Sequence, residues 1–138
     1  MSEWHATQEQ LAWIQKSKLV ETCQELSNLA AEILGLSEEI AAGKNDLRAA
    51  REEMELSAFT IQLNGVAGKN ADERAAALKV ALAQNEQHQK IVARMNDLEN
   101  AIAVLSARLE GKIAQAKALR ATIEAKSAVF NFLASTSS

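Results

Sequence analysis

The chain has 138 residues, of which 48% are hydrophobic, 24% charged and 4% aromatic, and its formal net charge at pH 7 is −3. It contains no proline and no tyrosine, and its β-branched residues are scattered, so helix is favoured throughout and no segment is typical of a strand. No apolar run approaches the roughly 20 residues that a membrane span needs, and no signal peptide is visible. We therefore expect a single all-α domain over residues 1–138, without membrane contact, in the cytoplasm.

The first half of the chain repeats apolar residues every seven positions. One row consists of Leu26, Ile33, Ile40, Leu47, Met54 and Ile61, and a second row of Leu29, Leu36, Gly43, Ala50 and Ser57. This alternation of three and four keeps both rows on one helix face and favours a left-handed coiled coil. We predict a helix over about 5–63. The lone Cys23 falls near this face, and we expect it to be a small buried side chain in a reducing compartment.

A weak break interrupts this helix at Ala42-Gly43-Lys44-Asn45. The same tetrapeptide returns near residue 67, which would suit a second hairpin with a true turn at Gly43. Against a turn, Ile40 and Leu47 stay in phase across the glycine. A turn, a kink and a continuous helix all remain open at this point.

A stronger break is the segment Asn64-Gly-Val-Ala-Gly-Lys-Asn70. Glycine and asparagine tolerate the positive φ that ends helices, and Asn70 or Asp72 is suited to capping the helix that follows. We predict a turn over 64–70, a second helix over about 71–133 and a loose tail over 134–138.

The second half carries its own pair of seven-residue rows. One row is Met95, Ile102, Leu109, Ala116, Ile123 and Phe130, and the other is Ile91, Leu98, Leu105, Lys112, Leu119, Lys126 and Leu133. Two seamed helices joined by a short turn form a long antiparallel helical hairpin. If the turn is centred on 64–70, residue i lies near residue 134 − i, which places His88 opposite Asp46. The first half is acidic, with five Lys and Arg against eleven Asp and Glu, and the second half is basic, with ten against seven. These opposite charges favour antiparallel pairing of the two halves.

Four of the five Trp and Phe residues would then collect at the open end of the hairpin. These are Trp4, Trp13, Phe130 and Phe132. They form either an aromatic plug that prevents fraying or an oligomer or partner surface, where aromatic residues are enriched.

Polar residues interrupt the second seam. Between Leu82 and Ile91 the seam positions are poor in apolar side chains, and further on two seam positions are lysines. Polar seam residues set register or oligomeric state in coiled coils. The alternative is a positively lined pocket for a phosphate or another acidic group, with contacts from Lys112, Lys117, Arg120 and Lys126.

Residues for catalysis or metal binding do not gather in the sequence. His5 and His88 are far apart, Cys23 has no histidine nearby, and the Gly-Lys pairs at 43–44 and 68–69 lack the Ser or Thr and the strand of a phosphate loop. The dispersed basic residues argue against nucleic-acid binding. We expect no catalytic residues, no metal site and no cofactor, and thus not an enzyme.

The turn and the helix after it resemble a known group of proteins. The stretch Gly68-Lys-Asn-Ala-Asp-Glu-Arg-Ala-Ala-Ala-Leu78 is similar to small alanine- and leucine-rich coiled-coil proteins of phages and prophages, which carry a Gly-Lys-Asn-x-x-Glu-Arg turn. The resemblance covers about 50–133, and this chain departs from it by an additional first arm. It implies a phage origin and a place in the host cytoplasm, and it assigns no functional residues.

The function expected from these patterns is a non-catalytic, self-associating coiled-coil interaction protein. Apolar residues outside the seams would remain exposed to water in a monomer, which favours a homo-oligomeric helical bundle. These residues are Trp13, Leu19, Leu34, Phe59, Val92, Val104, Ile113 and Val129. If the phage resemblance holds, the partner is a host defence protein or its small nucleotide signal. The alternatives are an accessory role in phage DNA recombination or replication, and a scaffold or spacer in virion assembly.

Overall fold

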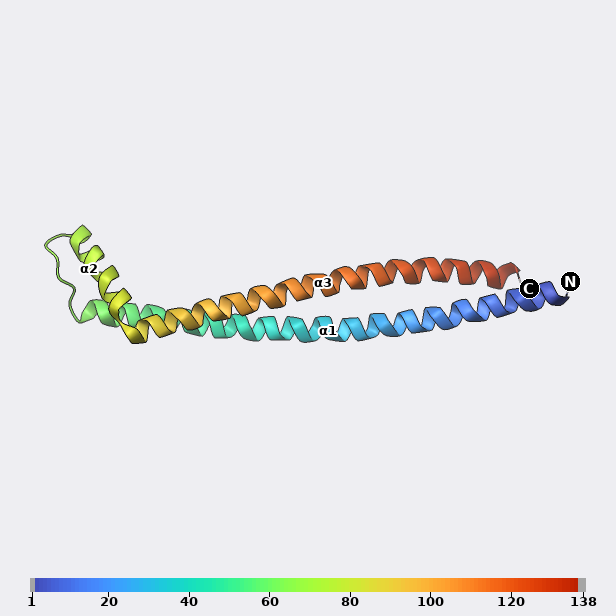
Figure 1. Ribbon diagram of the computed structural model, residues 1–138, viewed down its shortest axis with the longest axis horizontal. Helices are drawn as coiled ribbons and strands as arrows, with labels where there is room; N and C mark the ends of the chain where they lie inside the picture. The colour runs from blue at the N-terminus through green and yellow to red at the C-terminus, as the bar shows by residue number, and fades with distance from the viewer. Residues whose placement is uncertain (1, 137–138) are drawn as a thin grey trace. The chain divides into compact units, whose positions relative to one another are not determined.

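The computed structural model contains three α-helices: α1 (Ser2–Leu63), α2 (Ala71–Gln84) and α3 (Glu86–Thr136). It describes the backbone from residue 2 to residue 136 and the side chains of residues 9–14 and 16–135. No strand occurs within this range, so the expected all-α helical hairpin is confirmed. The chain divides into two compact units, unit 1 (1–37 with 107–138) and unit 2 (38–106). In each unit a segment of α1 packs against a segment of α3 (Figure 1).

The helix α1 runs through Gly43 without interruption, so the continuous alternative is correct. Gly43 lies in the seam, where a Cβ atom added to it would be 3.2 Å from Cγ1 of Ile102. Gly43 therefore allows α3 to approach α1 closely, and it does not form a turn. The cost of a glycine inside a helix, about 1 kcal/mol relative to alanine, is offset by this packing.

The seven-residue rows face the partner helix in both units, as the sequence predicted. In unit 2, Ile40, Leu47 and Ala50 of α1 are buried, and Ile102 and Leu105 of α3 are half-buried. In unit 1, Leu29 and Thr22 of α1 are buried against α3. Positions one residue away from these rows are mostly exposed. One of them is Cys23, which is exposed, so its predicted burial is wrong.

Capping hydrogen bonds from backbone amides to side chains stabilise the turn between α1 and α2. Gly65, with φ +95°, ends α1, and the side chain of Asn70 accepts a hydrogen bond of 2.9 Å from the Glu73 amide at the start of α2. The Glu73 carboxylate in turn accepts a bond of 2.8 Å from the Lys69 amide. A Cβ atom at Gly68 would lie 2.6 Å from the Arg74 nitrogen. The Gly-Lys-Asn-x-x-Glu motif thus has a complete local explanation as a helix cap.

The predicted second helix over 71–133 is divided in the structure, because Asn85 interrupts it. Asn85 has an extended backbone (φ −84°, ψ 109°), and its side chain accepts a hydrogen bond of 2.8 Å from the His88 amide, which makes it the N-cap of α3. The Gln89 side chain donates to the Leu82 carbonyl at the end of α2. The polar residues at 84–87 therefore form a helix boundary, whereas His88 is a buried polar residue of the seam, as its sequence position predicted. At the other end, α3 continues to Thr136, so residues 134–136 of the predicted tail are helical, and residues 137–138 lie outside the described residues.

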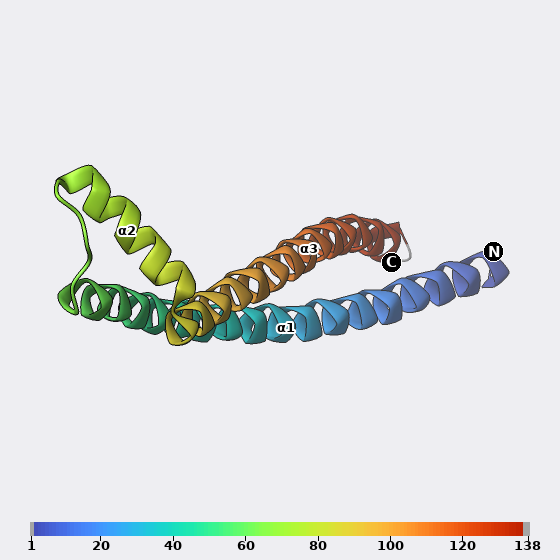
Figure 2. The same cartoon turned by 60° about the vertical axis from the view of Figure 1, so that its left-hand side comes forward.

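This boundary changes the register of the hairpin. Within unit 2, α2 points away from α1 and buries none of its residues, so the return of the chain along α1 starts only at α3 (Figures 1 and 2). His88 contacts Ser57, with 3.0 Å between Nδ1 and the hydroxyl oxygen, instead of lying opposite Asp46. In unit 1, Glu32 pairs with Lys112, whereas the predicted register gave it Ile102. The predicted register is wrong because it counted α2 as part of the paired helix.

Candidate interaction surface

Lys126 and Thr22 form a polar layer inside the apolar seam of unit 1. The Lys126 ammonium donates a hydrogen bond of 2.9 Å to the Thr22 hydroxyl, which itself donates to the Lys18 carbonyl over 2.8 Å. Thr22 is 5% exposed and Lys126 is half-buried. Such a layer restricts the helices to the alignment in which the donor meets its acceptor. Lys126 therefore has a structural role in helix pairing.

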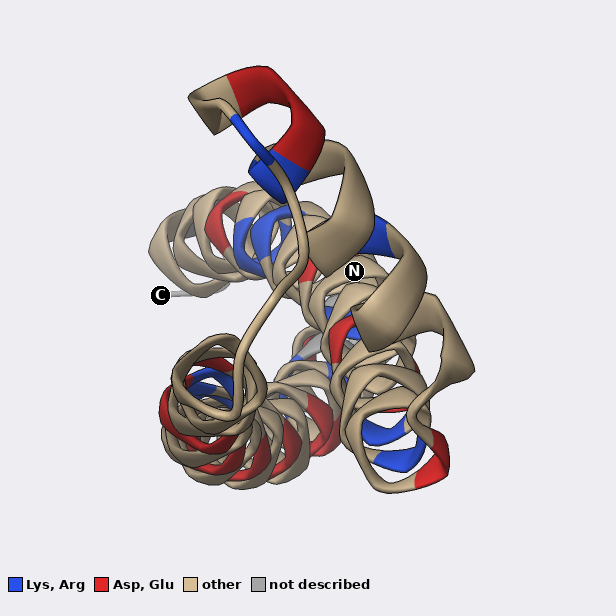
Figure 3. Cartoon of the chain, turned by 90° about the vertical axis from the view of Figure 1, so that its left-hand side faces the viewer, with Lys and Arg blue, Asp and Glu red and all other residues tan. Residues whose placement is uncertain are grey.

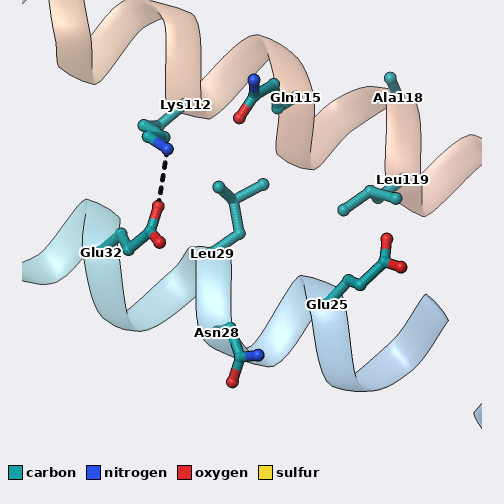
Figure 4. Close-up of a pocket in the computed structure, with 8 residues that line it drawn as sticks. All are labelled: Glu25, Asn28, Leu29, Glu32, Lys112, Gln115, Ala118 and Leu119. Atoms are coloured by element: carbon teal, nitrogen blue, oxygen red, sulfur yellow. Dashed lines mark ion pairs between the residues drawn. The ribbon is translucent and has the colours of Figure 1, made fainter. Parts of the chain in front are cut away.

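Lys112 lies at the edge of a shallow groove of about 480 Å³ between α1 and α3, with Leu29 and Leu119 pointing into it (Figure 4). Its ammonium forms an ion pair of 2.8 Å with Glu32, and Glu25 supplies a second carboxylate to the groove. Two carboxylates against one ammonium make the groove negative. This charge opposes the phosphate or other acidic ligand that the sequence suggested for Lys112.

The other two residues of the predicted anion site, Lys117 and Arg120, are exposed on α3 and do not line this groove. The seam positions of Lys112 and Lys126 turn both toward α1, whereas Lys117 and Arg120 lie off the seam. The structure thus does not bring the four cations into one pocket. Sequence spacing on one helix could not show that two of them are engaged by α1.

The predicted aromatic surface is only partly assembled. Phe130 is half-buried in the seam, whereas Trp13 is 70% exposed and Phe132 is 66% exposed. The Trp4 side chain lies outside the described residues. A surface groove next to Trp13 is lined by α1 residues alone. Trp13 and Phe132 are therefore not packed into an aromatic plug in this chain.

A row of exposed side chains runs along α1 in unit 1, one position past the seam. It comprises Trp13, Val20, Ser27 and Leu34 at exact seven-residue spacing, and we name it the α1 face. Val20 and Leu34 are each 61% exposed. None of the four carries a charge. Leu19, which the sequence grouped with these residues, is half-buried and belongs to the seam instead.

A second uncharged surface runs along α3 in unit 1, on the side away from the seam. We name it the α3 face; it consists of Ala107, Gly111, Ala114, Ala118, Ala121, Ala125, Ala128 and Phe132. All eight are exposed, and they follow the same alternation of three and four residues as a coiled-coil seam. Sequence reasoning missed this surface because it looked for large apolar residues. The sequence feature that could have revealed this surface is the absence of charged residues at eight successive positions of one helix face.

The charges of unit 1 are divided between its two helices. Residues 2–37 carry five acidic and two basic side chains, and residues 107–136 carry five basic and two acidic ones. In Figure 3, acidic segments are frequent along α1, the helix that ends at the loop. The Glu32–Lys112 pair is the one ion pair seen in unit 1 among the described side chains. Most of the described charged side chains of unit 1 therefore form no ion pair within the chain.

Unit 2 contains a buried histidine and two exposed ion pairs. His88 is 5% exposed and contacts Ser57, while Arg51 pairs with Glu99 at 3.4 Å and Arg94 with Glu53 at 3.3 Å. Exposed pairs of this kind contribute at most about 1 kcal/mol each. In the part of the chain that the structure describes, no three His, Cys, Asp or Glu side chains are placed to hold a metal ion. Over the same residues, none of the helices has the length and apolar character needed to cross a membrane.

Comparison with known proteins returned no family model, no curated protein and no solved structure that matches this chain.

Proposed function

We propose that this chain is a self-associating coiled-coil protein that acts by binding other proteins and not by catalysis. The observation that carries the proposal is the pair of uncharged, exposed faces on the two helices of unit 1. A surface helix of a monomer normally presents charged and polar residues on the side away from its partner. Here that side of α3 is alanine and glycine from Ala107 to Ala128.

The small buried core supports self-association. Among the described side chains, only four apolar ones are buried: Leu29, Ile40, Leu47 and Ala50. A hairpin with so small a core gains most of its further stability from contact with additional helices.

A protein partner fits the structure better than the nucleotide that the sequence suggested. A nucleotide needs several free cations in one pocket, and both seam lysines are engaged by α1. A coiled-coil partner needs only an apolar face with charged flanks, which unit 1 offers. Whether this partner comes from a phage host stays a prediction from the resemblance of the turn.

The proposal is tested by the mass of the protein in solution. Light scattering after size exclusion, at chain concentrations from about 1 to 100 μM, is expected to give a discrete multiple of 14.9 kDa. A monomer over the whole range would overturn self-association. Addition of a mixture of nucleotides to the same sample should leave no nucleotide bound at the protein peak; a retained nucleotide would restore the sequestering role.

A further inference from the structure

We propose that the α1 face of one copy packs against the α3 face of a second copy. This inference rests on the proposed self-association and specifies the surfaces that carry it. Both faces lie within unit 1, and both are exposed over their whole length. The complementary face of another copy is the occupant that fits each face in size and in charge.

The two faces complement each other in size. The α1 face projects three large side chains, Trp13, Val20 and Leu34, and one small one, Ser27, at intervals of seven residues. The α3 face presents only alanine and glycine between residues 107 and 128. Large residues opposite small ones interdigitate and allow two helices to approach closely. Pairing of the α1 face with itself would place large side chains against one another instead.

The two faces also complement each other in charge. The α1 segment of unit 1 has a net charge of −3, from five acidic and two basic residues. The α3 segment has a net charge of +3, from five basic and two acidic residues. Contact between α1 and the α3 of another copy brings opposite charges together, whereas pairing of two α1 segments or of two α3 segments brings like charges together. Complementary charge of this kind selects the partner and its orientation.

The test uses one charged substitution on each face and a matched control for each. Val20→Glu on the α1 face and Ala121→Glu on the α3 face are each expected to raise the dissociation constant at least tenfold and leave a monomer by light scattering. Val80→Glu and Ala76→Glu place the same substitutions on exposed positions of α2 and should leave the mass unchanged. Val20→Ala/Leu34→Ala, which preserves helix propensity, should also weaken assembly.

A mixture of the two charged variants provides the decisive result. The Val20→Glu chain retains an intact α3 face and the Ala121→Glu chain an intact α1 face, so the mixture should form a complex of two chains although each variant alone is monomeric. If wild-type protein assembles but the mixture stays monomeric, the two faces do not pair with each other and the inference is wrong; a single variant that keeps the wild-type mass would likewise show that its substituted face is not part of the interface. If both charged variants keep the wild-type mass, neither face is the interface. A monomeric wild type refutes the proposed function instead.

Discussion

Thr22→Val removes the hydroxyl that links α1 to Lys126 and keeps the size and branching of the side chain. This hydroxyl donates to the Lys18 carbonyl over 2.8 Å and accepts from the Lys126 ammonium over 2.9 Å. A hydrogen bond to a charged group contributes about 1.5–3 kcal/mol to stability. Because Lys126 is only half-buried, water replaces part of the lost contact. We expect the free energy of unfolding to fall by about 1 kcal/mol.

The matched control is Thr122→Val. Thr122 donates to the Ala118 carbonyl over 3.0 Å in the same local geometry as Thr22, but it is exposed, and no lysine contact accompanies its hydroxyl. Its replacement should change the free energy of unfolding by less than about 0.5 kcal/mol. Both variants are measured by urea unfolding, followed by circular dichroism at a fixed chain concentration. Equal effects of the two substitutions would show that the Lys126 contact contributes nothing.

The cycle is completed with Lys126→Leu, alone and together with Thr22→Val. Leucine at this seam position removes a charge from a half-buried site and adds apolar contact, so stability should rise by about 1–2 kcal/mol. In the double variant, the Thr22 substitution no longer removes a contact with Lys126. The coupling energy between the two positions should therefore be about 1 kcal/mol. A coupling energy near zero would refute the assignment of this pair as a seam interaction.

Two further predictions concern the seam and the helix boundary. Ile102→Asp/Leu105→Asp should remove most of the helical circular dichroism signal because it places two unpaired charges in the seam. The control Ala103→Asp/Val104→Asp, at exposed neighbouring positions, should preserve this signal. Equal spectra of the two double variants would contradict the seam assignment. Asn85→Ala should lower the free energy of unfolding by about 1 kcal/mol because the N-cap acceptor of α3 is lost. Asn85→Asp should keep this acceptor and the stability of the wild type. An Asn85→Ala variant as stable as the wild type would contradict the capping role.

Much of the architecture follows from local pattern. The seven-residue rows predicted which side chains would face the partner helix, and the capping residues at 64–70 predicted the turn, because both depend on helix geometry and on neighbours within a few residues. The phase of Ile40 and Leu47 correctly favoured a continuous helix through Gly43. The boundary at Asn85 also has a local signal, an asparagine followed by Glu86, although the interrupted seven-residue rows favoured a polar stretch of the seam over a helix end.

The candidate site depended on contacts across the hairpin and was less predictable. Lys112 and Lys126 were expected to bind an anion, but Glu32 and Thr22 of α1 engage them instead. Sequence spacing places residues on one face of a helix but does not say which residue of another helix lies opposite. That pairing depends on register, and an error in the register changes the partner assigned to every residue along the seam.

The sequence by itself therefore determined the all-α class, the seam and the hairpin, because helix periodicity and capping are encoded within short stretches of chain, but it did not reveal the break at Asn85. The tertiary structure decided the register, the roles of the seam lysines and the exposure of Cys23. It also revealed that the residues of the α1 face and of the α3 face of unit 1 are exposed to solvent. The physical reason is that α2 does not pair with α1, so the alignment of the seam is set by where α3 begins.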